Sequence, residues 1–260
     1  DGLRIDHPDG LRDPKQYLER LYRAAPGAWI VVEKILEPGE FLPPDWPVAG
    51  TTGYDFLNRV GGLFVDSRAE KELTDFYTEF TGEPADYAAL VRIKKRWALD
   101  HLLRAETDRL LHLLQQIIQR QASEKQADPN ELREALCALI VCLPVYRTYI
   151  RAGEVEHSVQ DKHWLHEAMT QALELEPCPQ PALLAFLVDV LQSKVGAGGQ
   201  EDEFVMRFQQ LTGPAMAKGV EDTSFYCFNR FAALNEVGGD PGHFGLSVAA
   251  FHQSCADVSK

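Results

Sequence analysis

Long apolar runs are missing from this sequence of 260 residues, and no uninterrupted stretch is long enough to form a membrane-spanning helix. The first residues also lack the charged and then apolar pattern of a secretory signal. Only five cysteines occur, and none forms a Cys-x-x-Cys pair, which argues against a disulfide framework and a zinc site. We therefore expect a chain of the reducing cytoplasm, without a membrane partner.

Positive charge is also scarce. Lysine and arginine together number 26, against 39 aspartate and glutamate residues, and the formal net charge is −13 at pH 7. This balance opposes binding to a phosphate backbone, so nucleic acid is not an expected partner. We interpret the one basic cluster, residues 92–96, as the solvated face of a long helix. The hydrophobic content of 45% suffices for one large domain or two smaller ones.

The histidines do not follow a familiar metal-binding pattern. His163 and His166 share a helical face at i and i+3, whereas the two histidines of zinc proteases are spaced i and i+4. We interpret them as a surface pair. Neither a metal ion nor another cofactor is expected.

Two short apolar segments, residues 2–6 and 29–33, each end in a carboxylate, Asp6 and Glu33. The stretch between them has apolar residues at helical spacing, and Asp13 can cap its first turn. The sequence therefore predicts a strand, a helix and a second strand.

A strand–helix–strand unit of this length makes a right-handed crossover between parallel strands, which brings Asp6 and Glu33 to the same carboxyl-terminal edge of the sheet. Catalytic residues lie at that edge in parallel barrels. Two carboxylates that face one cleft can cleave a glycosidic bond, one as nucleophile and the other as acid. The alternative is structural, because an acid at a strand end often caps the next helix or pairs with a nearby arginine such as Arg4.

Four distinctive motifs follow one another along the chain. They read Gly-Leu-Arg-Ile-Asp-His-Pro-Asp-Gly-Leu (2–11), Val-Val-Glu-Lys-Ile-Leu (31–36), Ala-Lys-Gly-Val-Glu-Asp-Thr (217–223) and Leu-Asn-Glu-Val-Gly-Gly-Asp-Pro (234–241). Together they resemble the maltooligosyl trehalose synthase family, a branch of the α-amylase clan. The resemblance covers nearly the whole chain and is weakest between residues 123 and 209.

For the fold, the resemblance implies an α/β chain that is a TIM-barrel fragment with a large, mainly α-helical insertion and is helix-rich overall. Residues 1–65 would hold the fourth and fifth strand motifs of the (β/α)8 barrel and the following loop. Residues 66–212 would form the helical insertion, and residues 213–260 would return to the barrel. Two clan motifs lie outside this sequence: an early Asn-His pair and a later His-Asp motif that supplies a third carboxylate. We therefore expect the isolated chain to be inactive.

For the activity, the resemblance implies conversion of the reducing-end α-1,4 link of a maltooligosaccharide to an α,α-1,1 link by double displacement. Asp6 would be the nucleophile and Glu33 the acid and then the base, with their carboxyl groups about 5–5.5 Å apart. Glu33 must carry a proton at the outset, and Arg4 would keep Asp6 ionised. The residues implied in substrate binding are Arg4, His7, Tyr54, Lys218 and Glu221. A hydrolase that releases trehalose from the product is an expected partner.

The loop after Glu33 is rich in proline and glycine and leads past Trp46 to Tyr54. The rings of these two residues either stack against a sugar or pack the loop against the protein, and the sequence favours neither. A mutase must retain the freed glucose in a closed pocket. We expect residues 50–58 and the helical insertion to form its wall.

Beyond residue 66 the pattern is mostly helical. Helices are expected at residues 67–80, 86–121 (bent once), 128–143, 158–175, 181–194 and 201–211. In the first of these, Leu73, Phe76, Tyr77 and Phe80 are expected on one apolar face. Residues 145–150 are β-branched and aromatic and predict a lone strand. Asp222 or Thr223 is expected to cap a helix that runs through residue 234.

Two other functions fit the same pattern. In the first, the carboxylates are structural and the chain is a non-catalytic glycan-binding or helical interaction module. In the second, the enzyme is an amylase-type hydrolase with water as the acceptor. The fate of reducing ends separates the two enzymes, because a hydrolase creates them and the mutase removes them.

Overall fold

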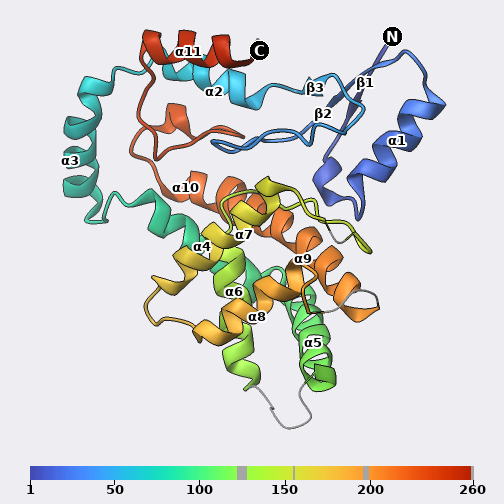
Figure 1. Ribbon diagram of the computed structural model, residues 1–260. Helices are drawn as coiled ribbons and strands as arrows, with labels where there is room; N and C mark the ends of the chain where they lie inside the picture. Colours follow the sequence, from blue (N-terminus) through green and yellow to red (C-terminus); the bar gives the residue numbers. More distant parts are fainter. Residues whose placement is uncertain (122–127, 155, 196–198, 259–260) are drawn as a thin grey trace.

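Helices make up most of the structure, a computed structural model that describes residues 1–121, 128–154, 156–195 and 199–258. The α-helices are α1 (Pro14–Ala24), α2 (Tyr54–Gly62), α3 (Glu70–Thr81), α4 (Tyr87–His101), α5 (Arg104–Gln121), α6 (Pro129–Cys142), α7 (Val159–Leu173), α8 (Pro181–Leu191), α9 (Gln200–Met216), α10 (Phe225–Cys227) and α11 (Val248–Val258). The strands are β1 (Gly2–Ile5), β2 (Trp29–Val32) and β3 (Gly50–Thr51). Figure 1 shows the sheet, α1, α2 and α11 in an upper layer, above a body built from α4 to α9.

The three strands form one parallel sheet in the order β1-β2-β3. β1 and β2 pair from Gly2 opposite Trp29 to Ile5 opposite Val32. α1 connects them, and the carboxylate of Asp13 accepts a hydrogen bond from the first turn of this helix. The predicted strand–helix–strand unit is therefore confirmed.

The body of the structure is a helical bundle with its own apolar core. α6 lies at its centre, and every residue from Ala135 to Cys142 is buried. The predicted long helix over residues 86–121 is divided at Leu102 into α4 and α5, which matches the expected bend. α5 and α9 pack along each other, as do α6 and α7, so the core is shared by helices far apart in the sequence.

Two expectations about exposure are wrong. Phe76 and Phe80 of α3 are 63% and 79% exposed and stack on each other, whereas Tyr77 on the same helix is buried. The basic cluster at residues 92–96 is not wholly solvated, because Lys95 is only 2% exposed and donates a hydrogen bond to the Leu143 carbonyl at 2.9 Å. Burial lowers the pKa of Lys95 to about 8.

The predicted strand at residues 145–150 is wrong, because this segment is extended but pairs with no strand. Side chains of neighbouring helices satisfy its backbone instead. Gln209 of α9 bonds both the N–H and the carbonyl of Ile150 at 2.8 Å, and Asp161 of α7 accepts from the Tyr149 N–H at 2.9 Å. A β-branched and aromatic composition alone does not distinguish a strand from an extended segment held in this way.

The predicted helix start at Asp222 or Thr223 is also wrong. α9 continues without a break into a π-helical segment, Ala217–Ser224, and then into α10, which ends before residue 234. The hydroxyl groups of Thr223 and Ser224 donate to carbonyls five residues earlier in the chain, each at 2.7 Å. These bonds support the wider turn, so no cap is needed there. π-Helical turns occur frequently at functional sites.

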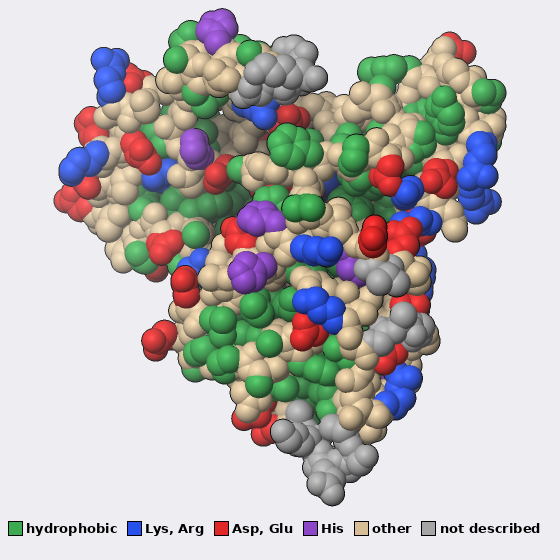
Figure 2. Space-filling model, in the orientation of Figure 1, with side chains coloured by type: hydrophobic (Ala, Val, Ile, Leu, Met, Phe, Trp, Pro, Cys, Tyr) green, Lys and Arg blue, Asp and Glu red, His purple; other side chains and the backbone are tan. Residues whose placement is uncertain are grey.

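The surface carries both charge signs. Figure 2 shows acidic and basic side chains distributed over the face in view, and a hollow between the two upper lobes. The histidines singled out in the sequence lie on α7, where His163 is 3.4 Å from the Glu167 carboxylate and His166 is exposed. The five cysteines all lie in the described ranges, and none of them forms a disulfide bond. Within the described ranges, no helix combines the length and the apolar character needed to cross a membrane.

Candidate active site

Asp6 and Glu33 directly follow the paired strands β1 and β2. Since Ile5 is opposite Val32, the two acids occupy matching positions one residue beyond the strand ends. The Glu33 N–H donates to the Ile5 carbonyl at 2.8 Å, which extends the ladder by one step. Neighbouring strands lie about 4.8 Å apart, so the crossover brings the two carboxylates to one edge of the sheet.

Arg4 lies between these carboxylates. Its Nη1 is 2.6 Å from Asp6 Oδ1, and its Nη2 is 3.8 Å from Glu33 Oε1. The Asp6 side chain is 75% exposed, but that of Glu33 is only 22% exposed. The two acids therefore have different environments, an open one beside a guanidinium and a sheltered one.

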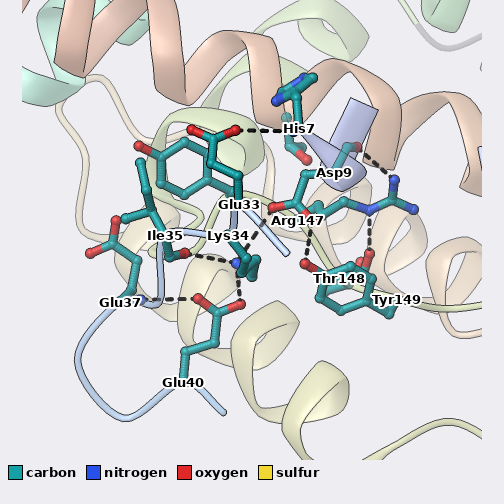
Figure 3. A network of polar contacts seen from close by, with 12 residues as sticks. His7, Asp9, Glu33, Lys34, Ile35, Glu37, Glu40, Arg147, Thr148 and Tyr149 are labelled. Atoms are coloured by element: carbon teal, nitrogen blue, oxygen red, sulfur yellow. Dashed lines mark hydrogen bonds and ion pairs between the residues drawn. The ribbon is translucent and has the colours of Figure 1, made fainter. Parts of the chain in front are cut away.

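The backbone of His7 also holds Glu33. His7 has φ 44° and ψ 55°, the left-handed region that costs a residue with a side chain about 1–3 kcal/mol. In this conformation its N–H donates to Glu33 Oε2 at 3.0 Å (Figure 3). A Cβ at Gly10 would lie 2.6 Å from the His7 ring, so a larger residue there would require that ring to move. The strained turn thus directs a donor at the sheltered carboxylate.

Tyr54 holds the second oxygen of Glu33. It is the first residue of α2, and its hydroxyl donates to Glu33 Oε1 at 3.3 Å. Burial, followed by the nearby Glu33 charge, raises the pKa of the Tyr54 hydroxyl, so the group remains a donor at neutral pH. Glu33 consequently has a bonding partner on each carboxylate oxygen.

Of the two predicted binding residues in the π-helical segment, Glu221 is the one near this site. It lies within electrostatic range of Glu33 and His7, and its Oε1 accepts a hydrogen bond from the Tyr146 hydroxyl at 2.5 Å. Burial raises the pKa of Glu221, and the bond from Tyr146 partly opposes that rise. Lys218 is instead exposed at the surface and pairs with Asp222 at 2.5 Å.

Gly219 explains why this segment packs so closely against α4. A Cβ at this position would lie 2.6–2.8 Å from atoms of Lys95, including its backbone nitrogen and Cα. Only glycine lets the two helical backbones approach to this extent. The close contact anchors the turn that carries Glu221.

A buried charged network lies behind Glu33, and the sequence analysis missed it. Lys34 is 2% exposed, and its Nζ is 2.8 Å from Glu40 and 3.5 Å from Asp9. The Tyr149 hydroxyl donates to the other oxygen of Asp9, and Arg147 approaches from the same extended segment (Figure 3). We call these five residues the Asp9 network.

Trp46 packs in the protein and does not present a stacking surface. It is 6% exposed in a small core with Leu18 and Val32, and its ring meets the Tyr149 ring edge-on at 5.0 Å. Of the two alternatives for this ring, Trp46 packs the loop against the protein. Tyr54, in contrast, reaches Glu33.

A cavity of about 370 Å³ opens next to this region, between the loop at residues 41–46 and lining residues in the ranges 147–154 and 156–161. Asp6 and Glu33 are not among its lining residues. Convergent carboxylates and donors, and not cavity size, therefore identify the candidate site in this chain.

Glu37 provides a test of the electrostatics around the network. Burial, followed by the charge of Glu40, raises its pKa from 4.5 to about 7. A carboxyl group whose pKa is raised in the folded state stabilises the fold below its unfolded pKa and loses that contribution as pH rises through the folded value. We expect the free energy of unfolding of wild type to fall by about 2–3 kcal/mol between pH 4.5 and 8 because of this group.

Glu37→Gln has no carboxyl group at this position, so this pH-dependent loss should disappear. The free energy of unfolding of the variant should therefore rise relative to that of wild type as the pH increases. Urea titrations of both chains at pH 5, 6.5 and 8 measure the difference, in which the other titrating groups cancel. A difference in free energy of unfolding that does not change with pH would contradict the assignment.

Comparison with known proteins shows which proteins this chain is similar to. No protein-family model matches the chain. A relative from Mycobacterium tuberculosis (strain ATCC 25618 / H37Rv), named as a maltooligosyl trehalose synthase, is 35% identical over 259 residues, which cover 98% of this chain and 31% of the relative. The solved maltooligosyltrehalose synthase of Arthrobacter ramosus is 39% identical, with a TM-score of 0.84, over 100% of this chain and 31% of that one.

A more distant solved structure shows the same relation. A hypothetical maltooligosyl trehalose synthase of Sulfolobus tokodaii is 31% identical, with a TM-score of 0.71, over 98% of this chain and 30% of that one. The chain thus spans less than a third of the length of these relatives. The resemblance carried by the four motifs is confirmed: along nearly its whole length this chain is similar to maltooligosyl trehalose synthases.

Proposed function

We propose that this chain supplies the nucleophile and the acid of an enzyme that converts the reducing-end α-1,4 link of maltooligosaccharides to an α,α-1,1 link. The observation that carries the proposal is the pairing of β1 with β2, which places Asp6 and Glu33 side by side with Arg4 between them. The similarity to maltooligosyl trehalose synthases supports the choice of substrate.

We infer that the three-stranded sheet is part of a (β/α)8 barrel in a longer enzyme. In that enzyme residues 1–65 and 213–260 belong to the barrel and residues 66–212 are inserted into it. Three strands leave apolar faces and edge groups for other strands to cover. A third carboxylate comes from outside this chain, and the chain alone is inactive.

In the proposed mechanism the two carboxylates have different roles. Asp6, open and paired with Arg4, attacks the anomeric carbon while protonated Glu33 gives its proton to the departing oxygen of the terminal glucose. The freed glucose turns within the pocket. Glu33, now a base, takes the proton from its anomeric hydroxyl, which attacks the glycosyl–Asp6 intermediate and forms the α,α-1,1 link. Two inversions give net retention.

Loss of reducing ends tests this function. The full-length enzyme that contains this chain is incubated with maltopentaose, and reducing ends and product linkage are followed by a colour assay and by NMR of the anomeric protons. We expect reducing ends to disappear without equivalent release of glucose. A rise in reducing ends would identify an amylase-type hydrolase, and binding without turnover would identify a glycan-binding module.

Tyr54→Ala should change the partition between transfer and hydrolysis. The ring and hydroxyl of Tyr54 cover Glu33, and their removal opens the pocket to water before the freed glucose can turn. We expect glucose release relative to transfer to rise several-fold. Tyr54→Phe is the matched control, because it keeps the ring and loses only the hydroxyl. An unchanged ratio in Tyr54→Ala would remove residues 50–58 from the pocket wall.

Two further proposals concern the setting of the enzyme. Its product still carries a glucan chain on the trehalose unit, so a hydrolase that releases trehalose is the partner expected to act next. Five cysteines without a disulfide bond suit a reducing cytoplasm, where we place the enzyme.

A further inference from the structure

Each catalytic carboxylate is followed closely in sequence by a member of the Asp9 network. Asp9 comes three residues after Asp6, and Lys34 comes directly after Glu33. In Figure 3 the Glu33 carboxylate lies beside His7, whereas Lys34 Nζ lies among the oxygens of the network. The network therefore joins the two strand ends that carry the reacting groups.

The centre of the network is nearly free of solvent. Asp9, Lys34 and Glu40 are 5%, 2% and 5% exposed. Lys34 Nζ also donates to the Ile35 carbonyl at 2.9 Å, so the cation has three oxygen partners of which two are carboxylates. The attraction of Asp9 and Glu40 outweighs the effect of burial and raises the pKa of Lys34, which keeps the side chain charged.

The helical body supplies the other half of the network. Tyr149 donates its hydroxyl to Asp9 across 140 residues of sequence. Arg147, 1% exposed, donates from Nη1 to the carbonyls of Asp9 and Leu11 at 2.8 and 2.6 Å. The turn that follows Asp6 is thus held by residues 145–150, the segment that was expected to be a strand.

We propose that the Asp9 network positions the two catalytic carboxylates relative to each other, with Lys34, Tyr149 and Arg147 as positioning residues. The bonds of Asp9 fix the turn after Asp6 relative to the helical body, and the ion pairs of Lys34 fix the strand end that carries Glu33. The inference deepens the proposed function and rests on it. A displacement of about 1 Å between reacting groups costs as much as about 10²-fold in rate, so small shifts at the network should reach the chemistry.

A pair of variants in the full-length enzyme separates positioning from stability. Lys34→Met leaves Glu40 and Asp9 buried without their cation, so it should lower both the melting temperature and kcat. Lys34→Met/Glu40→Gln removes both ions of the shorter pair and should recover much of the melting temperature. Because Asp9 still lacks Lys34, kcat should remain about 10²-fold below wild type, with KM within about threefold.

Two more variants complete the design. Tyr149→Phe removes one hydroxyl from Asp9 and should lower kcat about tenfold while KM stays nearly constant. Arg230→Met is the control, because Arg230 is a buried arginine that bonds the Pro241 carbonyl and packs on the rings of Phe228 and Phe244. It should lower the melting temperature without a comparable change in kcat measured at a temperature where all variants are folded.

The outcomes are distinguishable. Low kcat in the double variant despite recovered stability supports the inference. A kcat that recovers together with the melting temperature, or that falls as far in Arg230→Met as in Tyr149→Phe, overturns it. A wild-type enzyme that leaves the reducing ends of maltopentaose intact overturns the proposed function as well.

Discussion

Glu33→Gln in the full-length enzyme is expected to lower kcat for maltopentaose by about 10²–10⁴-fold, the usual contribution of a general acid. Glutamine keeps the size of the side chain and can still accept the His7 N–H bond, but it has no proton to give to the departing oxygen. The comparison therefore isolates proton transfer from packing. Initial rates of reducing-end loss measure it, and KM should change little because substrate contacts are retained.

A donor with a better leaving group makes this prediction sharper. An α-maltosyl fluoride needs little protonation of its leaving group, so the first release of fluoride, which precedes the step that needs Glu33 as a base, should be far less affected by the substitution than the cleavage of maltopentaose. Glu19→Gln is the matched control, since Glu19 lies on the surface of α1 and pairs with Arg23. Equal losses with both donors, or a loss below tenfold with maltopentaose, would remove Glu33 from the role of acid.

Lys34→Met is expected to lower the free energy of unfolding of the chain by about 3–5 kcal/mol, the usual effect of removing one partner from a buried ion pair. Glu40 and Asp9 would remain in a region that water does not reach, without the cation that balances them. Urea titration at pH 7, followed by far-ultraviolet circular dichroism, measures the change.

The control for this change is a partly exposed pair. Arg151 bonds Asp13 and Glu154, and its side chain is 27% exposed. Arg151→Met should cost about 1 kcal/mol or less, because exposed pairs contribute little. Similar losses for the two variants would show that burial does not set the strength of the Lys34 pair.

The part of the site that depends on residues close together in the sequence could be predicted. Asp6 and Glu33 end two apolar segments with a helix between them. A parallel crossover between these segments puts both acids at the carboxyl-terminal edge of the sheet. The position of Asp13 marked the start of α1 correctly for the same reason, since a cap acts within one turn.

The extended segment behind the site could not be predicted in this way. Its residues have strand propensity, but its hydrogen-bonding partners are Gln209 and Asp161 on two different helices. The π-helical segment could not be predicted either. It depends on the contact between Gly219 and Lys95, which are far apart in the sequence, and a local capping pattern contains no information about such a contact. One signal was available: Arg147 and Thr148 interrupt an apolar run, and buried polar residues require partners.

By itself, the sequence determined the two strands, the crossover helix and the edge at which the acids lie, because periodicity, capping and crossover handedness act over short distances along the chain. Only the tertiary structure decided that Lys34 is buried and charged, that Trp46 packs inside, and that Glu221 lies near the site and bonds Tyr146 whereas Lys218 pairs with Asp222 at the surface. The physical reason is that burial of a charge depends on partners distant in sequence, as Tyr149 is from Asp9. Those partners are brought together only when the helical body packs against the sheet.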